Sequence, residues 1–246
     1  MALFKTSNPA LRGAFTGEHA AFGDTMTMPG TVNKTGILLL CAIATSAWTW
    51  NRFHTDPESV GALVLGGAIG GFIVALVTIF KKEWSPITAP VYALLEGLVL
   101  GSISAMFEVR YNGIALQAIG LTFGVLVVML LAYSSGIIRV TDKLRLGIVA
   151  ATGGIALFYL VEFILGFFGF HFATINGNGA IGIGFSVIVV IVASLNLVLD
   201  FDLIEHGAQS GAPKYMEWYG AFAVMVTLIW LYLEMLRLLS KTRSRN

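Results

Sequence analysis

The sequence contains few charged residues: Asp, Glu, Lys and Arg make up only 12% of its 246 residues, whereas 57% are hydrophobic. Soluble globular domains average about 25% charged residues, so this chain lacks the polar surface that a water-soluble protein needs. The composition therefore excludes a soluble domain and indicates an integral membrane protein. The net charge of +1 is also too small for the basic surface of a nucleic-acid-binding protein.

Cysteine and metal-ligand patterns are equally scarce. The single cysteine, Cys41, lies in an apolar run, so an internal disulfide cannot form. The histidines lack the spacing of a zinc site, and they are His19, His54, His171 and His206. The last apolar run contains no lysine for a retinal Schiff base, and the sequence has no nucleotide-binding loop or haem pattern. We therefore expect neither an enzyme nor a bound cofactor.

Long apolar runs, by contrast, are abundant. A helix needs about 20 apolar residues to cross the roughly 30 Å of hydrocarbon in a bilayer. Seven runs approach or reach this length, and they cover residues 35–50, 59–80, 87–107, 113–134, 146–169, 180–202 and 217–240. Because backbone groups in lipid must be paired within the protein, the sequence predicts an all-α polytopic membrane protein with seven transmembrane helices. The predicted bundle covers residues 35–246 and follows a polar tail at residues 1–34.

The positions of Lys and Arg predict the orientation of these helices. Cytoplasmic connections carry an excess of both residues. Most of them lie in the tail or in the even-numbered connections, namely Lys5, Arg12, Lys34, Lys81, Lys82, Arg139, Lys143, Arg145 and Lys214. We therefore expect a multi-pass protein of the cell membrane with a cytoplasmic N-terminus. Lys241, Arg243 and Arg245 would then lie outside, unless the last two segments form a re-entrant hairpin.

Two carboxylates within the last two apolar runs, Asp200 and Glu234, are the strongest functional candidates. An acid in the middle of a membrane costs roughly 2.5–3.5 kcal/mol on insertion scales, so such residues usually serve a function. If their helices are adjacent and antiparallel, the two acids could meet and share a proton as a pH-operated switch. Ionised, they could also bind Ca²⁺. Asn196 lies one helical turn before Asp200, on the same face.

Each acid also has a purely structural explanation. Asp200 could lie in water at a helix end together with Asp202 and Glu205. Glu234 could form a local salt bridge with Arg237, three residues away on the same helix. Both explanations remain open at the level of the sequence.

Two further acids lie within the predicted spans, Glu96 in the third and Glu162 in the fifth. Each is either a buried, hydrogen-bonded carboxyl group or a group that lines a pore or relays protons. The second span is rich in small residues from Gly61 to Gly71. Such spacing lets helices approach closely in lipid, so we expect packing within the bundle, with homodimerisation as the alternative.

Several motifs carry a family resemblance. They are Leu195-Asn-Leu-Val-Leu-Asp200-Phe-Asp202-Leu-Ile, Leu231-Tyr-Leu-Glu234-Met-Leu, Asn33-Lys-Thr-Gly, Ala150-Ala-Thr-Gly-Gly-Ile-Ala and Gly211-Ala-Pro-Lys-Tyr-Met-Glu-Trp-Tyr-Gly220. From about residue 33 to its end, the chain resembles the bacterial branch of the Bax inhibitor-1 (transmembrane Bax inhibitor motif) family. The resemblance implies a seven-helix fold and a pH-sensitive calcium leak channel, with Ca²⁺ as a permeant or weakly bound ion.

The resemblance also implies roles for particular residues. In the family, aspartates from the sixth and seventh helices form the pH sensor, and a basic residue that ends the second helix can latch them. By position, these roles fall to Asp200, Glu234 and either Lys81 or Lys82. The chain departs from the family in having glutamate as the second acid and lysine in place of arginine, which loses the bidentate guanidinium fork.

Two other functions remain alternatives. The protein could be a non-channel regulator that binds a membrane partner, such as a quality-control protease, through its N-terminal tail and helices. It could also be a proton-coupled transporter that uses Glu96 and Glu162, although no inverted repeat is visible in the sequence. In each case the expected surroundings are a lipid bilayer, and the expected ions for the channel are protons and calcium.

Overall fold

The computed structural model describes residues 25–170 and 172–244, which form helices joined by short turns. The long helices are α2 (Met28–Thr55), α3 (Pro57–Phe80), α4 (Ser85–Arg110), α5 (Ile114–Ser134), α6 (Asp142–Gly166), α8 (Ala180–Gln209) and α9 (Met216–Arg243). Two short elements, η1 (Lys82–Trp84) and α7 (Ala173–Asn176), precede α4 and α8. No strand is present within these described ranges, so the predicted all-α class is confirmed.

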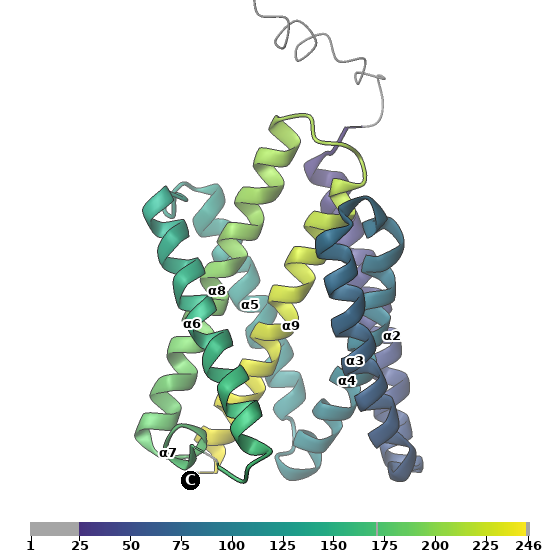
Figure 1. Cartoon of the computed structure of the whole chain (residues 1–246), viewed down its shortest axis with the longest axis vertical. Coiled ribbons are helices and arrows are strands. Elements are labelled where there is room, and N and C mark those ends of the chain that lie inside the picture. The colour runs from purple at the N-terminus through teal and green to yellow at the C-terminus, as the bar shows by residue number, and fades with distance from the viewer. Residues whose placement is uncertain (1–24, 171, 245–246) are drawn as a thin grey trace, which may run out of the picture.

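The long helices alternate in direction and stand side by side as a bundle (Figure 1). The last helix, α9, lies at its centre, where it packs against α2, α4, α5 and α8. One apolar cluster lies between α9, α8 and α5 and includes Leu197 and Leu228. A second lies between α9, α2 and α4 and includes Leu38, Ala93 and Met225. The hydrophobic core of the bundle is thus built around α9.

Small residues bring α4 close to both of its neighbours. On the α2 side, the Ser46 hydroxyl donates to the Gly97 carbonyl oxygen at 2.9 Å, and a Cβ atom at Gly101 would overlap the Ser46 carbonyl oxygen. On the α3 side, a Cβ atom at Gly67 would lie 2.8 Å from the Leu95 carbonyl oxygen. The predicted close packing of the glycine-rich second run therefore occurs within the bundle, against α4.

Helix α2 begins earlier than its apolar run suggested. Thr27 caps it, because its hydroxyl accepts a hydrogen bond from the Gly30 amide at 3.1 Å. Pro29 follows in the first turn, where proline is well tolerated because the missing N–H has no partner there. Part of the predicted polar tail is therefore helical, and residues 1–24 lie outside the described residues.

Six of the seven long helices are long and apolar enough to cross a membrane. Helix α2 is the exception, because it carries several polar residues along its length, among them Lys34, Thr45, Ser46 and Arg52. The predicted membrane protein is thus supported by six candidate spans, whereas the predicted total of seven is not confirmed.

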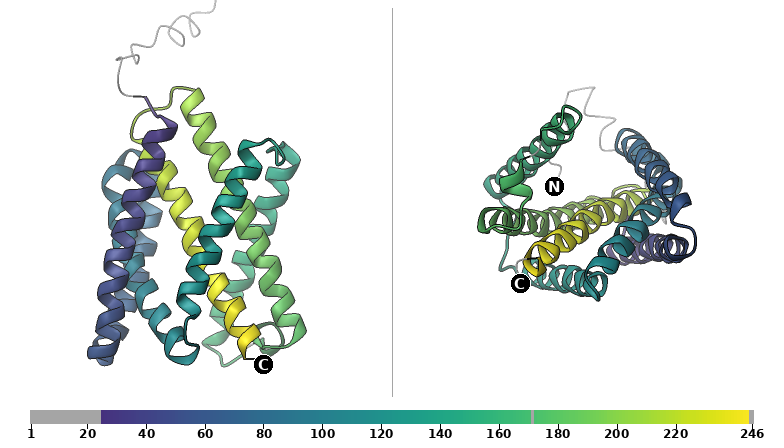
Figure 2. Two further views of the ribbon diagram at one scale, coloured as in Figure 1. Left: turned by 180° about the vertical axis from the view of Figure 1, so that it is seen from behind. Right: turned by 90° about the horizontal axis from the view of Figure 1, so that it is seen from below.

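The last two helices form a full-length hairpin rather than a re-entrant loop. Helices α8 and α9 contain 30 and 28 residues, so each is more than about 40 Å long at 1.5 Å per residue. Both extend over most of the height of the bundle, and the C-terminal end of α9 lies at the end opposite to the start of α2 (Figures 1 and 2). This arrangement disfavours the re-entrant hairpin that was considered because of the C-terminal charges.

Candidate functional site

Asp200 lies nine residues before the end of α8, where it contacts α9. The hydroxyl of Thr227 on α9 donates a hydrogen bond to the Asp200 Oδ2 atom at 2.6 Å. The structural explanation for Asp200 placed it in water together with Asp202 and Glu205. These two acids are bonded to other helices instead, because Arg145 donates a hydrogen bond to Asp202 and the Tyr133 hydroxyl donates one to Glu205. Asp200 is therefore a partly buried acid at a helix–helix contact.

Asp200 shares a pocket with a second membrane acid, Glu96 of α4. We name this cavity of about 560 Å³ the acid pocket, and it is lined by Ala68, Phe72, Ala75, Ile79, Tyr92, Glu96, Asp200, Phe222, Ala223, Val226 and Thr227. Its walls come from α3, α4, α8 and α9, and α3 makes no extensive contact with α8 across it. The structure thus brings together two of the acids that the sequence singled out.

A glycine makes room for the Glu96 carboxylate. A Cβ atom at Gly71 of α3 would lie 2.8 Å from the Glu96 Oε1 atom. Any larger residue at this position would displace the carboxylate, because real Cβ atoms essentially never come so close to another heavy atom. The close approach of α3 and α4 therefore positions Glu96 beside the α3 backbone as well as in the acid pocket.

Glu234 belongs to a separate cluster. It is only 2% exposed, and it accepts hydrogen bonds from the Tyr159 hydroxyl at 2.9 Å and from Arg237 Nη1 at 3.1 Å. Arg237 also donates to the Tyr159 hydroxyl, so the three side chains form a closed network between α6 and α9. The local salt bridge that was the structural explanation for Glu234 is therefore present.

Asp200 and Glu234 do not meet, although α8 and α9 are adjacent. Thr227, the partner of Asp200, lies seven residues before Glu234 on α9, which corresponds to about 10 Å along the helix axis. The hairpin is asymmetric: α8 ends at Gln209, soon after Asp200, whereas α9 begins at Met216, far before Glu234. The expected contact between the two acids is therefore absent from this conformation.

The two candidate latch lysines also lie away from these acids. Lys81 follows the last residue of α3, and Lys82 Nζ lies 5.1 Å from the centre of the Tyr219 ring. Tyr219 precedes Thr227 by two turns of α9, about 12 Å along the axis. Among the residues that the structure describes, neither lysine forms a salt bridge with an acid, so no latch is engaged here.

The remaining candidates, Asn196 and Glu162, have structural partners. Asn196 Nδ2 donates to the Thr152 hydroxyl at 2.8 Å and to the Val192 carbonyl at 2.9 Å, which ties α8 to α6. Glu162 accepts a hydrogen bond from Asn176 of α7. Neither residue lines the acid pocket, so Glu96 is the one additional candidate that shares a site with Asp200.

The family model described as Bax inhibitor 1 like matches residues 8–244, nearly the whole chain. The chain belongs to the Bax inhibitor 1 like family. This membership confirms the resemblance carried by the sequence motifs, and it agrees with the six membrane-length helices. A search of curated proteins finds no match.

In this Bax inhibitor 1 like protein, the structure also identifies a buried acid that the sequence did not single out. Glu217, at the start of α9, is fully buried, and it pairs with Lys34 of α2 and with Lys214 at 2.8 Å. The Thr27 amide and hydroxyl donate to the same carboxylate at 2.9 and 2.8 Å. The spacing of Lys214 and Glu217 could have revealed one of these contacts, but the contacts with α2 connect distant parts of the sequence.

The acid pocket of this family member is lined by oxygen-bearing side chains. Asp200 and Glu96 supply carboxylate oxygens, while Thr227 and Tyr92 add hydroxyl oxygens. Calcium takes six to eight oxygen ligands, and the described residues contain no group of three or more His, Cys, Asp or Glu side chains that could hold a metal. The pocket therefore holds fewer oxygen-bearing side chains than a complete calcium coordination shell requires.

Proposed function

We propose that this Bax inhibitor 1 like protein is a pH-sensitive calcium leak channel in which Asp200 is the principal titrating group. The observation that carries the proposal is the acid pocket, in which Asp200 of α8 and Glu96 of α4 line one cavity between membrane-length helices. Ionisable residues within membrane spans are rare and usually mark ion or proton pathways. Two such acids in one cavity support an ion pathway at this point.

In the proposed mechanism, protons control both the charge and the packing of the pocket. Ionised carboxylates at Asp200 and Glu96 offer hard oxygen ligands to a passing Ca²⁺ ion. Protonation removes that charge and turns Asp200 into a hydrogen-bond donor, which changes its contact with Thr227. The proton therefore shifts the balance between conformations that differ at the α8–α9 contact.

Glu234 is proposed as a second pH-sensitive contact rather than as a partner of Asp200. Its carboxylate links α9 to α6 through Tyr159 and pairs with Arg237. Protonation would weaken the pair with Arg237 and loosen α9 from α6. Lys82 is the better placed of the two proposed latch residues, because it already contacts α9 through Tyr219.

We also propose that α2 is the seventh span, that the protein lies in the cell membrane, and that its N-terminus is cytoplasmic. The 28 residues of α2 correspond to about 42 Å of helix, which exceeds the roughly 30 Å of hydrocarbon. Its polar Ser46 and Thr45 face inward, against Gly97 of α4. Internal packing of these groups supports a membrane position despite the lower apolar content of α2.

The experiment that tests the channel is calcium flux from liposomes that contain the purified full-length protein, measured over a series of pH values. The wild type is expected to release Ca²⁺ at a rate that depends on pH. Asp200→Asn and Glu96→Gln should each flatten this dependence, since they remove a titrating group from the acid pocket. Glu58→Gln, which changes an exposed acid at the start of α3, is the matched control and should keep the wild-type profile.

Two outcomes would contradict the proposal. An unchanged pH profile in both pocket variants would show that the acid pocket does not control the flux. Absence of flux from the folded wild type at every pH would exclude a calcium channel and favour the regulatory alternative. Proton uptake that depends on an added substrate would instead favour a transporter.

A further inference from the structure

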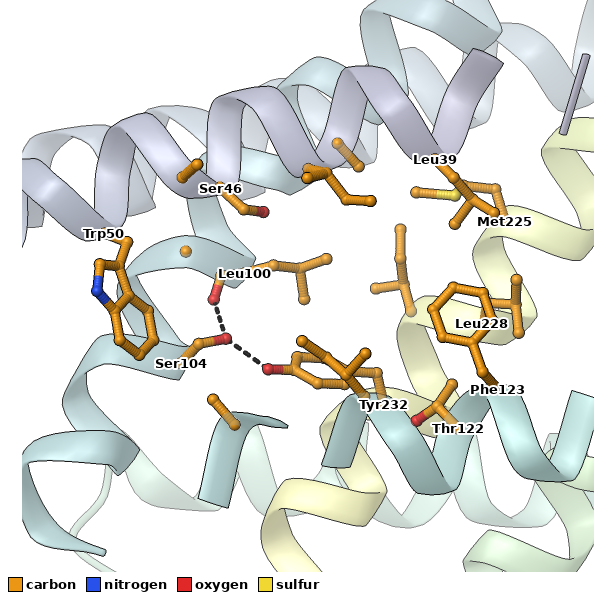
Figure 3. A pocket seen from close by; sticks show the side chains of 17 residues that line it. Leu39, Ser46, Trp50, Leu100, Ser104, Thr122, Phe123, Met225, Leu228 and Tyr232 are labelled. Carbon is orange, nitrogen blue, oxygen red and sulfur yellow. Dashed lines mark hydrogen bonds between the residues drawn. The ribbon is translucent and has the colours of Figure 1, made fainter. Parts of the chain in front are cut away.

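A second cavity, of about 410 Å³, lies on the other side of α9 and has a different chemical character. Four helices, α2, α4, α5 and α9, contribute its walls. Figure 3 shows Leu39 and Trp50 of α2 facing Leu228 and Tyr232 of α9, with Leu100 of α4 between them. We name it the apolar cavity. Its volume falls within the range of about 300–1,000 Å³ that is typical of ligand pockets.

The hydroxyl groups in the wall of the apolar cavity are already paired within the protein. The Ser104 hydroxyl donates to the Leu100 carbonyl at 2.6 Å and lies 2.7 Å from the Tyr232 hydroxyl (Figure 3). Ser46 donates to Gly97, and Thr122 donates to the Ala118 carbonyl at 2.8 Å. Apolar cavities of this kind stay dry and bind apolar molecules instead. The wall therefore selects against water and against polar ligands.

The apolar cavity opens sideways, between α2 and α5. Both helices pack against α4 and α9, but they make no extensive contact with each other. In the left panel of Figure 2, which shows the bundle from behind, part of α9 (yellow) is visible between α2 (purple) and α5 (teal). Two of the lining residues, Ile43 of α2 and Ile119 of α5, are exposed, with 56% and 43% of their surface accessible. The mouth is thus apolar, and with α2 as a membrane span it would face the hydrocarbon of the surrounding bilayer.

With α2 as a membrane span, as proposed above, the cavity would reach from one membrane interface to the middle of the bilayer. Along α2 it extends from Leu39 to Trp50, which is about 16 Å at 1.5 Å per residue. This is close to half of the roughly 30 Å hydrocarbon thickness, and therefore to the depth of a single leaflet. Trp50 lies one turn from the end of α2, next to Asn51 and Arg52, where tryptophan is typical of the membrane interface.

We propose that the apolar cavity binds one acyl chain of a bilayer phospholipid, which enters between α2 and α5 with its headgroup at the level of Trp50. The apolar wall, the opening toward hydrocarbon and the depth of one leaflet all match such a chain. The proposal does not depend on the calcium channel, because it rests on a cavity that shares no lining residue with the acid pocket.

The test uses phosphatidylcholine with a photoreactive diazirine in its tail. The full-length protein is reconstituted with this lipid, illuminated, and digested, and the labelled residues are identified by mass spectrometry. Labelling is expected at Met225, Leu228 and Tyr232, which are buried in the protein wall of the cavity and at most 9% exposed. Lipids around the outside of the bundle do not reach these positions.

Matched variants connect the labelling to the cavity. Ala47 lines the mouth, so Ala47→Phe should fill it and reduce the labelling of α9 several-fold. Ala44→Phe adds the same side chain at an exposed position of α2 that does not line the cavity, and it should leave the labelling unchanged. Ile119→Trp provides a second filling variant from α5, in case Ala47→Phe does not fold.

Three results would overturn the proposal. The first is labelling confined to exposed residues such as Leu116, with α9 unlabelled in the wild type. The second is labelling of α9 that persists in a folded filling variant. The third concerns the source of the chain: if a diazirine fatty acid labels α9 and the phosphatidylcholine does not, the occupant is a free fatty acid rather than a phospholipid tail.

Discussion

At the scale of single residues, the buried charges of this protein are paired across helices. Glu217 binds groups from α2 and from the start of α9, Glu234 is bonded by Tyr159 of α6, and Lys241 donates to oxygens near the start of α8. A buried charge that loses its partner is strongly destabilising, because it is left without either water or a counter-charge. These contacts therefore fix how the helices are joined at the two ends of the bundle.

The first prediction concerns Glu217. Glu217→Gln removes the charge that Lys34 and Lys214 share, and it should destabilise the protein by about 3 kcal/mol, the lower end of the range for broken buried pairs. The lower end applies because both lysines keep some access to water. Thermal unfolding in detergent measures the effect. Glu83→Gln, at an exposed acid in η1, is the control, and an equal melting temperature for the two variants would contradict the prediction.

A second prediction at this scale concerns Lys241. Its ammonium group donates to the Ile175 carbonyl at 2.9 Å, the Gly182 carbonyl at 3.0 Å and the Ser186 hydroxyl at 3.0 Å. Lys241→Met keeps much of the side-chain volume but leaves these acceptors without their donor, at a cost of about 1–3 kcal/mol.

The consequence of Lys241→Met should be a lower melting temperature and faster proteolysis at the end of α9. Lys143→Met, at an exposed position near the start of α6, should change neither property. The idea fails if the two methionine variants behave alike.

Local spacing explains which residue contacts could be predicted from the sequence. The Glu234–Arg237 pair follows from residues three apart on one helix, which must lie on one face. Asp200 and Glu96 were each identified as membrane acids, but their common pocket depends on how α8 and α4 are arranged around α9. Sequence spacing within one helix carries no information about that arrangement.

At the scale of helices, the apolar runs of the sequence predicted where the helices lie better than where they begin and end. The run at 180–202 predicted α8, but the helix continues to Gln209, because a helix does not have to stop where the hydrocarbon ends. Likewise, α2 begins at Met28 because Thr27 and Pro29 start it, not because the chain becomes apolar there. An apolar run indicates which residues lie in lipid, whereas capping residues indicate where a helix begins.

The close contact of α2 and α4 gives a prediction at this scale. Gly101→Ala places a Cβ atom into the Ser46 carbonyl of α2 and should destabilise the bundle by about 1–3 kcal/mol, as overpacked cores do. Gly124→Ala on α5 is the matched control, because a Cβ atom there meets nothing within 4 Å. The control should be neutral or slightly stabilising, since alanine favours helix over glycine.

This prediction is tested by measuring the unfolding of both alanine variants in the same detergent. If Gly101→Ala is as stable as the control, then α2 can move away from α4 without loss. Such a result would also weaken the proposal that the polar residues of α2 are packed within the membrane.

At the scale of the whole molecule, α2 determines the topology, because it differs from the other long helices in its polar content. Six helices meet the length and apolarity of a membrane span and α2 does not, yet all the long helices alternate in direction in one bundle (Figure 1). The isolated bridge between Thr25 and Pro213 places the start of α2 beside the α8–α9 turn. If α2 crosses the membrane, its two ends must face opposite compartments.

Cysteine labelling in sealed vesicles tests this arrangement. In a Cys41→Ser background, cysteines at Thr25 and Glu58 should react with an impermeant reagent from opposite sides, because α2 lies between them. A cysteine at Ser210, in the α8–α9 turn, should react from the same side as Thr25. Labelling of Thr25 and Glu58 from one side would leave the protein with six spans.

The position of α9 between the acid pocket and the apolar cavity has a thermodynamic consequence. Phe222 and Thr227 of α9 line the acid pocket, whereas Met225 and Tyr232 of α9 line the apolar cavity. A sideways shift of α9 that widens one of these cavities therefore narrows the other. Binding of a lipid chain in the apolar cavity and binding of a proton in the acid pocket are then linked through the same displacement of α9. Linkage of this kind is reciprocal: the factor by which a bound lipid chain changes the proton affinity of the acid pocket equals the factor by which protonation of that pocket changes the affinity for the lipid chain.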